Sequence, residues 1–222
     1  KILLVLIILL VVVGTGVIIG LVYGFFGDDL KIDLSKLTMI ENTVIVDSNE
    51  NVLAELNGKE SRKIITLDEM SPYLPKAYIA IEDERFYQHH GVDLKRTTAA
   101  ILSFVTHFGK STTGGGSTIT QQVSKNIFFN QEKSISRKLG EAFGAFDLEK
   151  NYSKNEIFEL YVNTAYFGDG YYGIYAASHG YYNKDPKDLT LDESSMLAGV
   201  PNAPSVYAPT VNIGLARQRQ KQ

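Results

Sequence analysis

The feature that most constrains this chain is an uncharged apolar stretch at its start. Residues 2–27 contain no Asp, Glu, Lys or Arg. As a helix rising roughly 1.5 Å per residue, the stretch would extend about 39 Å, which exceeds the roughly 30 Å hydrocarbon core of a bilayer. We therefore predict a transmembrane helix over 1–27. A cleaved signal peptide is the alternative, but the run is too long and no small-residue cleavage site follows it.

The residues that flank and fill this stretch predict its orientation and a contact. Lys1 precedes it and acidic residues occupy 28–29, which favours an N-terminus inside and a domain outside. Gly16, Gly20 and Gly24 lie four residues apart, a spacing that permits close helix–helix approach. Self-association through this face is one interpretation, and the ordinary glycine content of membrane helices is the other.

Composition restricts what the rest of the chain can do. The chain is 44% hydrophobic and 21% charged, which is typical of a globular domain. Its net charge of −3 argues against a general nucleic-acid binder. It has no cysteine, which excludes disulfides, thiol catalysis and cysteine-ligated zinc. Residues 216–222 stop within a helical pattern, so we expect a fragment of a longer protein.

Strand signals are confined to the segment before residue 71. Two short β-type runs at 43–47 and 52–56 flank the polar residues 48–51, which predicts a hairpin. We assign 28–70 to a juxtamembrane connector with this hairpin.

From residue 71 onward the pattern becomes helical. The apolar spacing predicts a first helix that runs past Arg85, so that Glu82, Arg85 and Phe86 share one face. A second helix is expected at about 93–107. The domain should therefore be mainly α.

Two further helices should carry polar groups toward a cleft. Ser117 is expected to cap a helix on which Gln122 and Lys125 lie off the apolar stripe. Ser134 is expected to cap the helix that carries Arg137, Lys138 and Glu141. Both cations can reach the Glu141 carboxylate, since they precede it by four and three residues. Capping boxes at 153–156 and 190–193 predict helices near 154–166 and 191–199.

Each motif taken alone is weak evidence of function. An acidic run such as 82–84 is usually a solvated helix face, and Glu141 could merely pair with its own helix. His89 and His90 are adjacent and so do not share a face, which leaves no metal ligand set to assign.

Together and in order, five motifs give a specific pattern. They are Glu-Asp-x-x-Phe-x-x-His-x-Gly at 82–91, Gly-x-Ser-Thr-Ile-Thr-Gln-Gln at 115–122, Arg-Lys-x-x-Glu at 137–141, Glu-Leu-Tyr-Val-Asn-Thr-Ala-Tyr-Phe-Gly at 159–168 with Gly173, and Met-Leu-Ala-Gly-Val-Pro at 196–201 before Ala203 and Pro204. From about Tyr78 to Pro209 the chain resembles the peptidoglycan glycosyltransferases (glycosyltransferase family 51). These are the transglycosylase domains of class A penicillin-binding proteins and the monofunctional transglycosylases.

The resemblance implies a fold, a substrate and a location. The fold is a lysozyme-like α domain with a head and a smaller jaw near the membrane, over 71–222. The substrate is lipid II, a disaccharide-pentapeptide on undecaprenyl pyrophosphate, and the partner is the growing glycan strand. The location is a bacterial cell membrane, with a single pass and the domain outside. Other cell-wall synthesis proteins are possible partners.

The resemblance also implies roles for individual residues. The family's general base matches Glu82 and its second acid matches Glu141, the two residues we assign as catalytic. The residues assigned to the substrate are Arg85, Phe86, Ser117, Thr118, Gln121, Gln122, Lys125, Arg137 and Lys138. Some relatives have a cation where this chain has Gly140, so we add Lys133 to the phosphate site. Asn163 and Tyr166 are expected to be structural.

The chemistry of these groups suits glycosyl transfer. A carboxylate can take the proton of the sugar 4-hydroxyl during attack, and Glu82 is the candidate base. Lysine, arginine or a divalent cation (Mg or Mn) can stabilise the leaving pyrophosphate, although no cofactor need be required. Glu141 would position these cations, hold a metal or steady a cationic sugar. By analogy with inverting glycosidases, the two carboxylates should lie roughly 6.5 Å or more apart.

Two rival functions remain open. A muramidase or lytic transglycosylase on the same fold would also use a glutamate but needs no pyrophosphate site. An inactive membrane-anchored scaffold would need neither acid, and the presence of both Glu82 and Glu141 speaks against it.

Overall fold

The computed structural model describes residues 63–106, 116–129 and 135–222, the two hairpin strands, and four isolated positions in the apolar stretch at 13, 16, 20 and 24. The predicted transmembrane helix lies outside the described residues apart from those four positions, and Lys133 and Ser134 lie outside them too. Within the described part, no helix combines the length and hydropathy needed to cross a bilayer.

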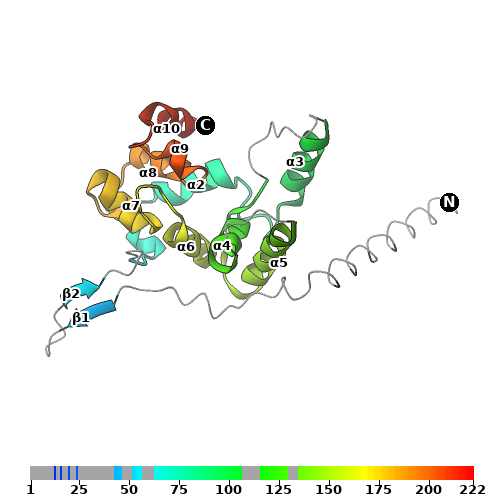
Figure 1. Ribbon diagram of the computed structural model, residues 1–222, viewed down its shortest axis with the longest axis horizontal. Coiled ribbons are helices and arrows are strands. Elements are labelled where there is room, and N and C mark those ends of the chain that lie inside the picture. Colours follow the sequence, from blue (N-terminus) through cyan, green and yellow to red (C-terminus); the bar gives the residue numbers. More distant parts are fainter. Residues whose placement is uncertain are drawn as a thin grey trace.

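The predicted hairpin is confirmed. Strand β1 (Thr43–Val46) pairs antiparallel with β2 (Val52–Leu56), and the register shifts between Ile45 and Val46. Figure 1 shows the hairpin at one end of the domain, opposite helix α3.

The rest of the described chain is helical, as predicted. Its elements are η2 (Leu67–Glu69), α2 (Tyr73–Glu82), α3 (Leu94–Thr106), α4 (Ile119–Phe128), α5 (Ile135–Asn151), α6 (Lys154–Thr164), α7 (Gly173–Tyr182), η3 (Pro186–Asp188), α8 (Leu191–Gly199), α9 (Pro204–Tyr207) and α10 (Ile213–Gln220). The capping boxes at Ser153 and Thr190 are both formed, which fixes the starts of α6 and α8.

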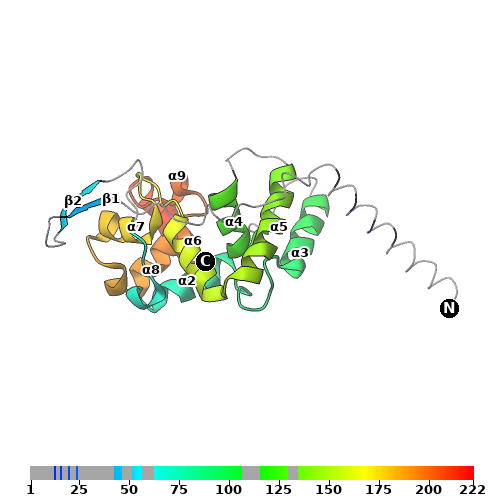
Figure 2. The same ribbon diagram turned by 90° about the horizontal axis from the view of Figure 1, so that it is seen from below.

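The helices form two groups joined by α2 and α6. On one side α4 packs on α5 and α6, with α3 at the same end of the domain. On the other side α10 packs on α8 and α9, and α2 packs on α8 (Figures 1 and 2). Functional side chains from both groups can therefore meet where α2 ends.

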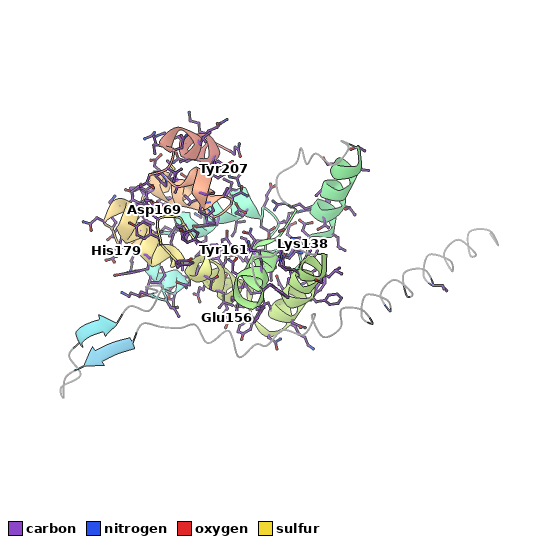
Figure 3. The ribbon with its side chains drawn as sticks, in the orientation of Figure 1. Lys138, Glu156, Tyr161, Asp169, His179 and Tyr207 are labelled. Atoms are coloured by element: carbon purple, nitrogen blue, oxygen red, sulfur yellow. The ribbon has the colours of Figure 1, made fainter. Side chains whose placement is uncertain are left out.

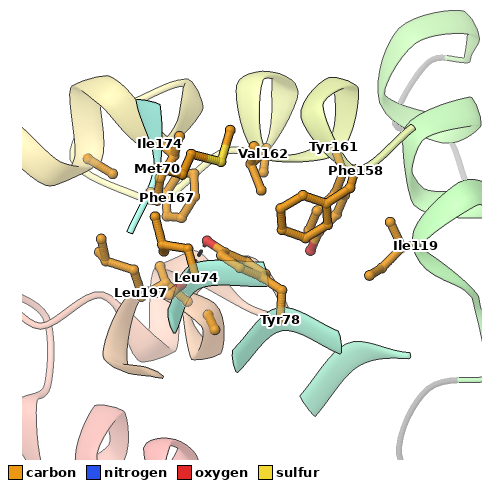
Figure 4. Packing of buried hydrophobic residues seen from close by; sticks show 14 of the residues in the cluster. Met70, Leu74, Tyr78, Ile119, Phe158, Tyr161, Val162, Phe167, Ile174 and Leu197 are labelled. Carbon is orange, nitrogen blue, oxygen red and sulfur yellow. Dashed lines mark hydrogen bonds between the residues drawn. The ribbon is translucent and has the colours of Figure 1, made fainter. Parts of the chain in front are cut away.

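An aromatic cluster holds α2 against α6. The Tyr78 ring meets Phe158 and Tyr161 edge to face, with centroids 6.0 Å and 5.6 Å apart. The Tyr78 hydroxyl donates to the carbonyl of Leu197 at 3.3 Å, so α8 is tied to the same residue (Figure 4). These side chains are buried, and they fix the helix whose last residue is Glu82.

Two predicted helix boundaries are wrong. Helix α2 ends at Glu82 because Asp83 leaves the helical conformation (φ −158°), so Arg85 and Phe86 lie in the following turn rather than on the face of Glu82. Helix α4 is capped by Thr118 instead of Ser117. The Thr118 hydroxyl accepts from the Gln121 amide at 3.1 Å, and the Gln121 side chain accepts from the Thr118 amide at 3.0 Å.

Asn163 is structural, as predicted, and its removal should be costly. Its buried amide accepts from the Ile65 N–H at 3.1 Å and donates to the Ile65 carbonyl at 2.8 Å. In Asn163→Leu, both backbone groups lose their partner in the core, so we expect unfolding free energy to fall by about 2–4 kcal/mol. Urea denaturation measures the loss. The exposed Asn151→Ala should change stability by less than about 0.5 kcal/mol, and an equal effect of both substitutions would contradict this role.

Candidate functional site

Glu82 is the centre of the candidate site. It is the last residue of α2 and is only 5% exposed. One carboxylate oxygen accepts from Gln122 Nε2 at 3.0 Å, and the other accepts from Arg219 Nη2 at 3.2 Å. An amide from α4 and a guanidinium from α10 therefore fix the orientation of this carboxylate.

The Glu82 cavity, a hollow of about 380 Å³, opens beside this carboxylate. Its polar wall comes from Arg96, Ser117, Gln122 and Lys125, together with Arg219. Pro201, Asn202 and Tyr207 close it from the fifth sequence motif and α9. Figure 3 labels Tyr207 on α9 and Lys138 on α5, which belong to the two different groups of helices.

The first motif holds α2 and α4 together. Asp83 Oδ2 accepts from the Ile119 N–H at 3.0 Å and contacts His89 Nε2 at 2.9 Å. A carboxylate on the first amide of a helix is favourable, because the N-terminus carries partial positive charge. The result is that Gln122, one turn further along α4, is brought to Glu82.

Gly91 ends this motif and is required by its surroundings. Its φ is +87°, and a Cβ there would lie 2.8 Å from the Ala145 backbone of α5. Its carbonyl accepts from the Thr118 hydroxyl at 2.5 Å. Through Gly91, the motif thus holds the start of α4 close to α5.

A cluster of three cations, Lys125, Arg137 and Lys138, extends from the wall of this cavity, which Lys125 lines. Lys138 Nζ donates to Ser117 Oγ at 2.6 Å and to Glu141 Oε2 at 2.7 Å. Arg137 pairs with the other oxygen of Glu141. Glu141 is 1% exposed, so it lies behind the two cations rather than on the cavity wall.

The three cations act on one another. Burial lowers the pKa of Lys125 below its ordinary value, Arg137 lowers it further, and Glu82 opposes the shift. Burial also lowers the pKa of Lys138, with further lowering by Arg137 and Lys125. Lys125 therefore interacts with Glu82 as well as with Arg137 and Lys138. An anion bound there would relieve the mutual repulsion of the three cations.

Four of the residues predicted to contact the substrate do not line the Glu82 cavity. Phe86 is fully buried, with Tyr87 at 5.2 Å between ring centroids and Lys154 Nζ 4.6 Å from its ring, so it belongs to the core. Thr118 and Gln121 are buried in the cap of α4, away from the cavity wall. Arg85 pairs with Asp93 at 2.5 Å and lines a different cavity.

Other predicted residues do meet. Ser117, Gln122 and Lys125 line the Glu82 cavity. For Gln122 and Lys125 this agrees with the prediction from their position off the apolar stripe of the helix. Arg137 and Lys138 lie beside it through Ser117 and Lys125. Their contacts with a substrate stay predictions, as does the separation of Glu82 and Glu141.

Asp83 and Arg219 hold the site together but were not among the residues predicted from the sequence. Arg219 lies 137 residues from Glu82, and local spacing gives no sign of that pairing. Asp83 stands in the first motif, but its partners are His89 and the Ile119 amide of α4. Neither contact could be predicted before the fold was known. Within the described part of the chain, no three His, Cys, Asp or Glu side chains gather as a metal site.

Comparison with known proteins decides the family. The family model described as Transglycosylase matches residues 49–222. This chain belongs to the transglycosylase family. The peptidoglycan glycosyltransferase assignment drawn from the five motifs is thereby confirmed.

Relatives of this transglycosylase include penicillin-binding proteins. Penicillin-binding protein 1F of Bacillus subtilis (strain 168) is 42% identical over 214 residues, which cover 96% of this chain and 30% of that protein. Penicillin-binding protein 1A of Neisseria lactamica is 43% identical over 176 residues, 79% of this chain and 22% of that protein. The chain thus spans less than a third of the length of either relative.

A solved structure is also similar. Penicillin-binding protein 1A from Haemophilus influenzae matches with a TM-score of 0.39 and 19% identity, over 81% of this chain and 17% of that chain.

Proposed function

We propose that this transglycosylase polymerises lipid II into glycan strands, with inversion at the anomeric carbon and release of undecaprenyl pyrophosphate. The observation that carries the proposal is the Glu82 cavity. A fixed carboxylate lines it together with Lys125, and the charge of Lys125 is coupled to Arg137 and so to Lys138. A candidate base and part of a candidate anion site thus line one cavity.

The geometry suggests how the reaction proceeds. The acceptor 4-hydroxyl transfers its proton to Glu82 while its oxygen attacks the anomeric carbon of the donor. The bond to the pyrophosphate breaks on the opposite face, and its electron pair leaves with the phosphate. Lys125, Arg137 and Lys138 then stabilise the charge that develops on the leaving group. The separation of roughly 6.5 Å or more between Glu82 and Glu141 belongs to the same proposal.

Glu141 acts in this proposal as a positioning residue. Of its three possible roles, holding the cations fits best, since both carboxylate oxygens already bind Arg137 and Lys138 and the group is buried. A divalent cation carried by the pyrophosphate would add to the same field. Rates with EDTA and with added Mg²⁺ or Mn²⁺ measure that contribution.

The location follows from the substrate. A lipid-linked sugar is delivered by a membrane, so we propose a single-pass anchor in a bacterial cell membrane with the domain outside. Self-association and contacts with other cell-wall synthesis proteins are proposals of the same rank.

Two substrates separate the proposed polymerase from its nearest rival. Lipid II and preformed glycan are each incubated with the chain, and the products are sized. We expect long glycan from lipid II and no cleavage of preformed glycan. Cleavage without polymerisation would indicate a muramidase or lytic transglycosylase, and neither reaction would indicate a scaffold.

The lowered pKa of Lys125 predicts a pH effect. A lysine with a lowered pKa loses its proton at a lower pH than the ordinary value of 10.5, so its attraction for pyrophosphate fades as pH rises through the lowered pKa. Lys125→Arg keeps its charge, and we expect its KM for lipid II to rise at a higher pH than in the wild type. The exposed Lys150→Arg is the control, and identical pH profiles for all three proteins would contradict the role of Lys125.

A further inference from the structure

The larger of the cavities near the first motif has no part in the mechanism above. It encloses about 690 Å³, within the usual range of ligand pockets. The end of α2, the turn after it and the first part of α3 form its wall. We call it the α2–α3 cavity.

The α2–α3 cavity adjoins the Glu82 cavity. The two share Ile81 and Arg96 as lining residues. Arg96 also donates from its guanidinium to the carbonyl oxygen of Glu82. A ligand whose reacting end lies at Glu82 can therefore place another part of itself in the α2–α3 cavity, one side chain away.

Charges of both signs line the α2–α3 cavity in equal number. The basic residues are Arg85, Lys95 and Arg96, and the acidic residues are Asp83, Glu84 and Asp93. Most of these are engaged within the protein: Arg85 pairs with Asp93, Arg96 holds the Glu82 carbonyl, and Asp83 holds α4.

Two charged groups in this wall are available to a ligand. Across the described ranges, neither the Lys95 ammonium nor the Glu84 carboxylate has a hydrogen bond or an ion pair, and both residues are exposed. The cavity thus offers a ligand one available cation and one available anion. Ala80, Ile81 and Ala99 add a wall that suits small apolar groups.

We propose that the α2–α3 cavity binds the peptide of the lipid-linked substrate, with Lys95 on a peptide carboxylate and Glu84 on a peptide amino group. This inference rests on the proposed function. A phosphate is a poorer fit, because the one available cation, Lys95, shares the wall with the available Glu84 carboxylate, which would repel a dianion. A short peptide can carry an amino group and a carboxylate at once, which matches the two available groups of the wall.

Binding without turnover tests the inference. Lipid II is titrated into the Glu82→Gln protein in three forms: native, with the peptide carboxylates amidated, and with the peptide amine acetylated. We expect Lys95→Ala, added to this background, to raise Kd for the native form about threefold and to leave Kd for the amidated form unchanged. Glu84→Ala should do the same with respect to the acetylated form. Lys76→Ala, an exposed lysine of α2 outside the cavity, is the matched control.

The outcomes are distinguishable. Unchanged Kd values in both variants would overturn the inference. A Lys95→Ala effect that persists on the amidated form would also overturn it, since the cation would then hold a phosphate. A wild-type chain that neither binds nor polymerises lipid II would remove the proposed function and this inference together, whereas normal polymerisation with insensitive variants would remove only the inference.

Discussion

Glu82→Gln is expected to reduce lipid II polymerisation by about 10²–10⁴-fold, the usual contribution of a general base. The amide cannot accept the acceptor proton, but it keeps the size and shape of the side chain. Gln122 can still bond to it, so the local fold should persist. Initial rates of glycan formation, together with a thermal melt, separate lost chemistry from lost structure.

Asp147→Asn is the matched control for this substitution. It also replaces one carboxylate by an amide, but on the exposed face of α5 and outside the Glu82 cavity. We expect its rate to stay within about twofold of the wild type, because surface substitutions away from a site are nearly neutral. More than a tenth of the wild-type rate in Glu82→Gln would remove Glu82 from the role of base.

Glu141→Gln is expected to lower both activity and stability. The neutral amide leaves Arg137 and Lys138 without their shared counterion. Breaking a buried pair typically costs about 3–5 kcal/mol, but Lys138 is half exposed and can turn to water, so we expect about 1–3 kcal/mol of unfolding free energy. The freed cations should also lose their alignment on the pyrophosphate, which predicts about a tenfold to hundredfold lower kcat/KM.

Glu149→Gln separates these two effects. Glu149 lies on the same helix and pairs with Lys154 at 2.6 Å while accepting from Thr120, so its substitution should also destabilise the fold. It is outside the Glu82 cavity, and its kcat/KM at a temperature below melting should stay near that of the wild type. Equal losses of activity in the two variants would mean that Glu141 matters only for stability.

Local signals in the sequence predicted the helices well. The capping boxes at Ser153 and Thr190 are complete within four residues, so the sequence of each segment is enough to predict where its helix begins. The hairpin and α3 follow from equally local patterns. The family followed from five motifs read in order.

Contacts between distant segments could not be predicted from the sequence. The first helix appeared to continue because its apolar spacing does, but Asp83 is held by α4 and His89 and leaves the helix there. Phe86 is consequently buried in the core. Arg219 reaches Glu82 only because α10 packs on α8, a tertiary fact with no local signature.

The central claim is that Glu82 and the three-cation cluster act on one substrate in one cavity. A crystal structure of the Glu82→Gln protein with bound lipid II measures this directly. We predict the acceptor 4-hydroxyl within about 3.2 Å of the side chain at position 82, and a pyrophosphate on Lys125, Arg137 and Lys138. Sugars bound away from position 82, or a pyrophosphate bound away from these cations, would contradict it.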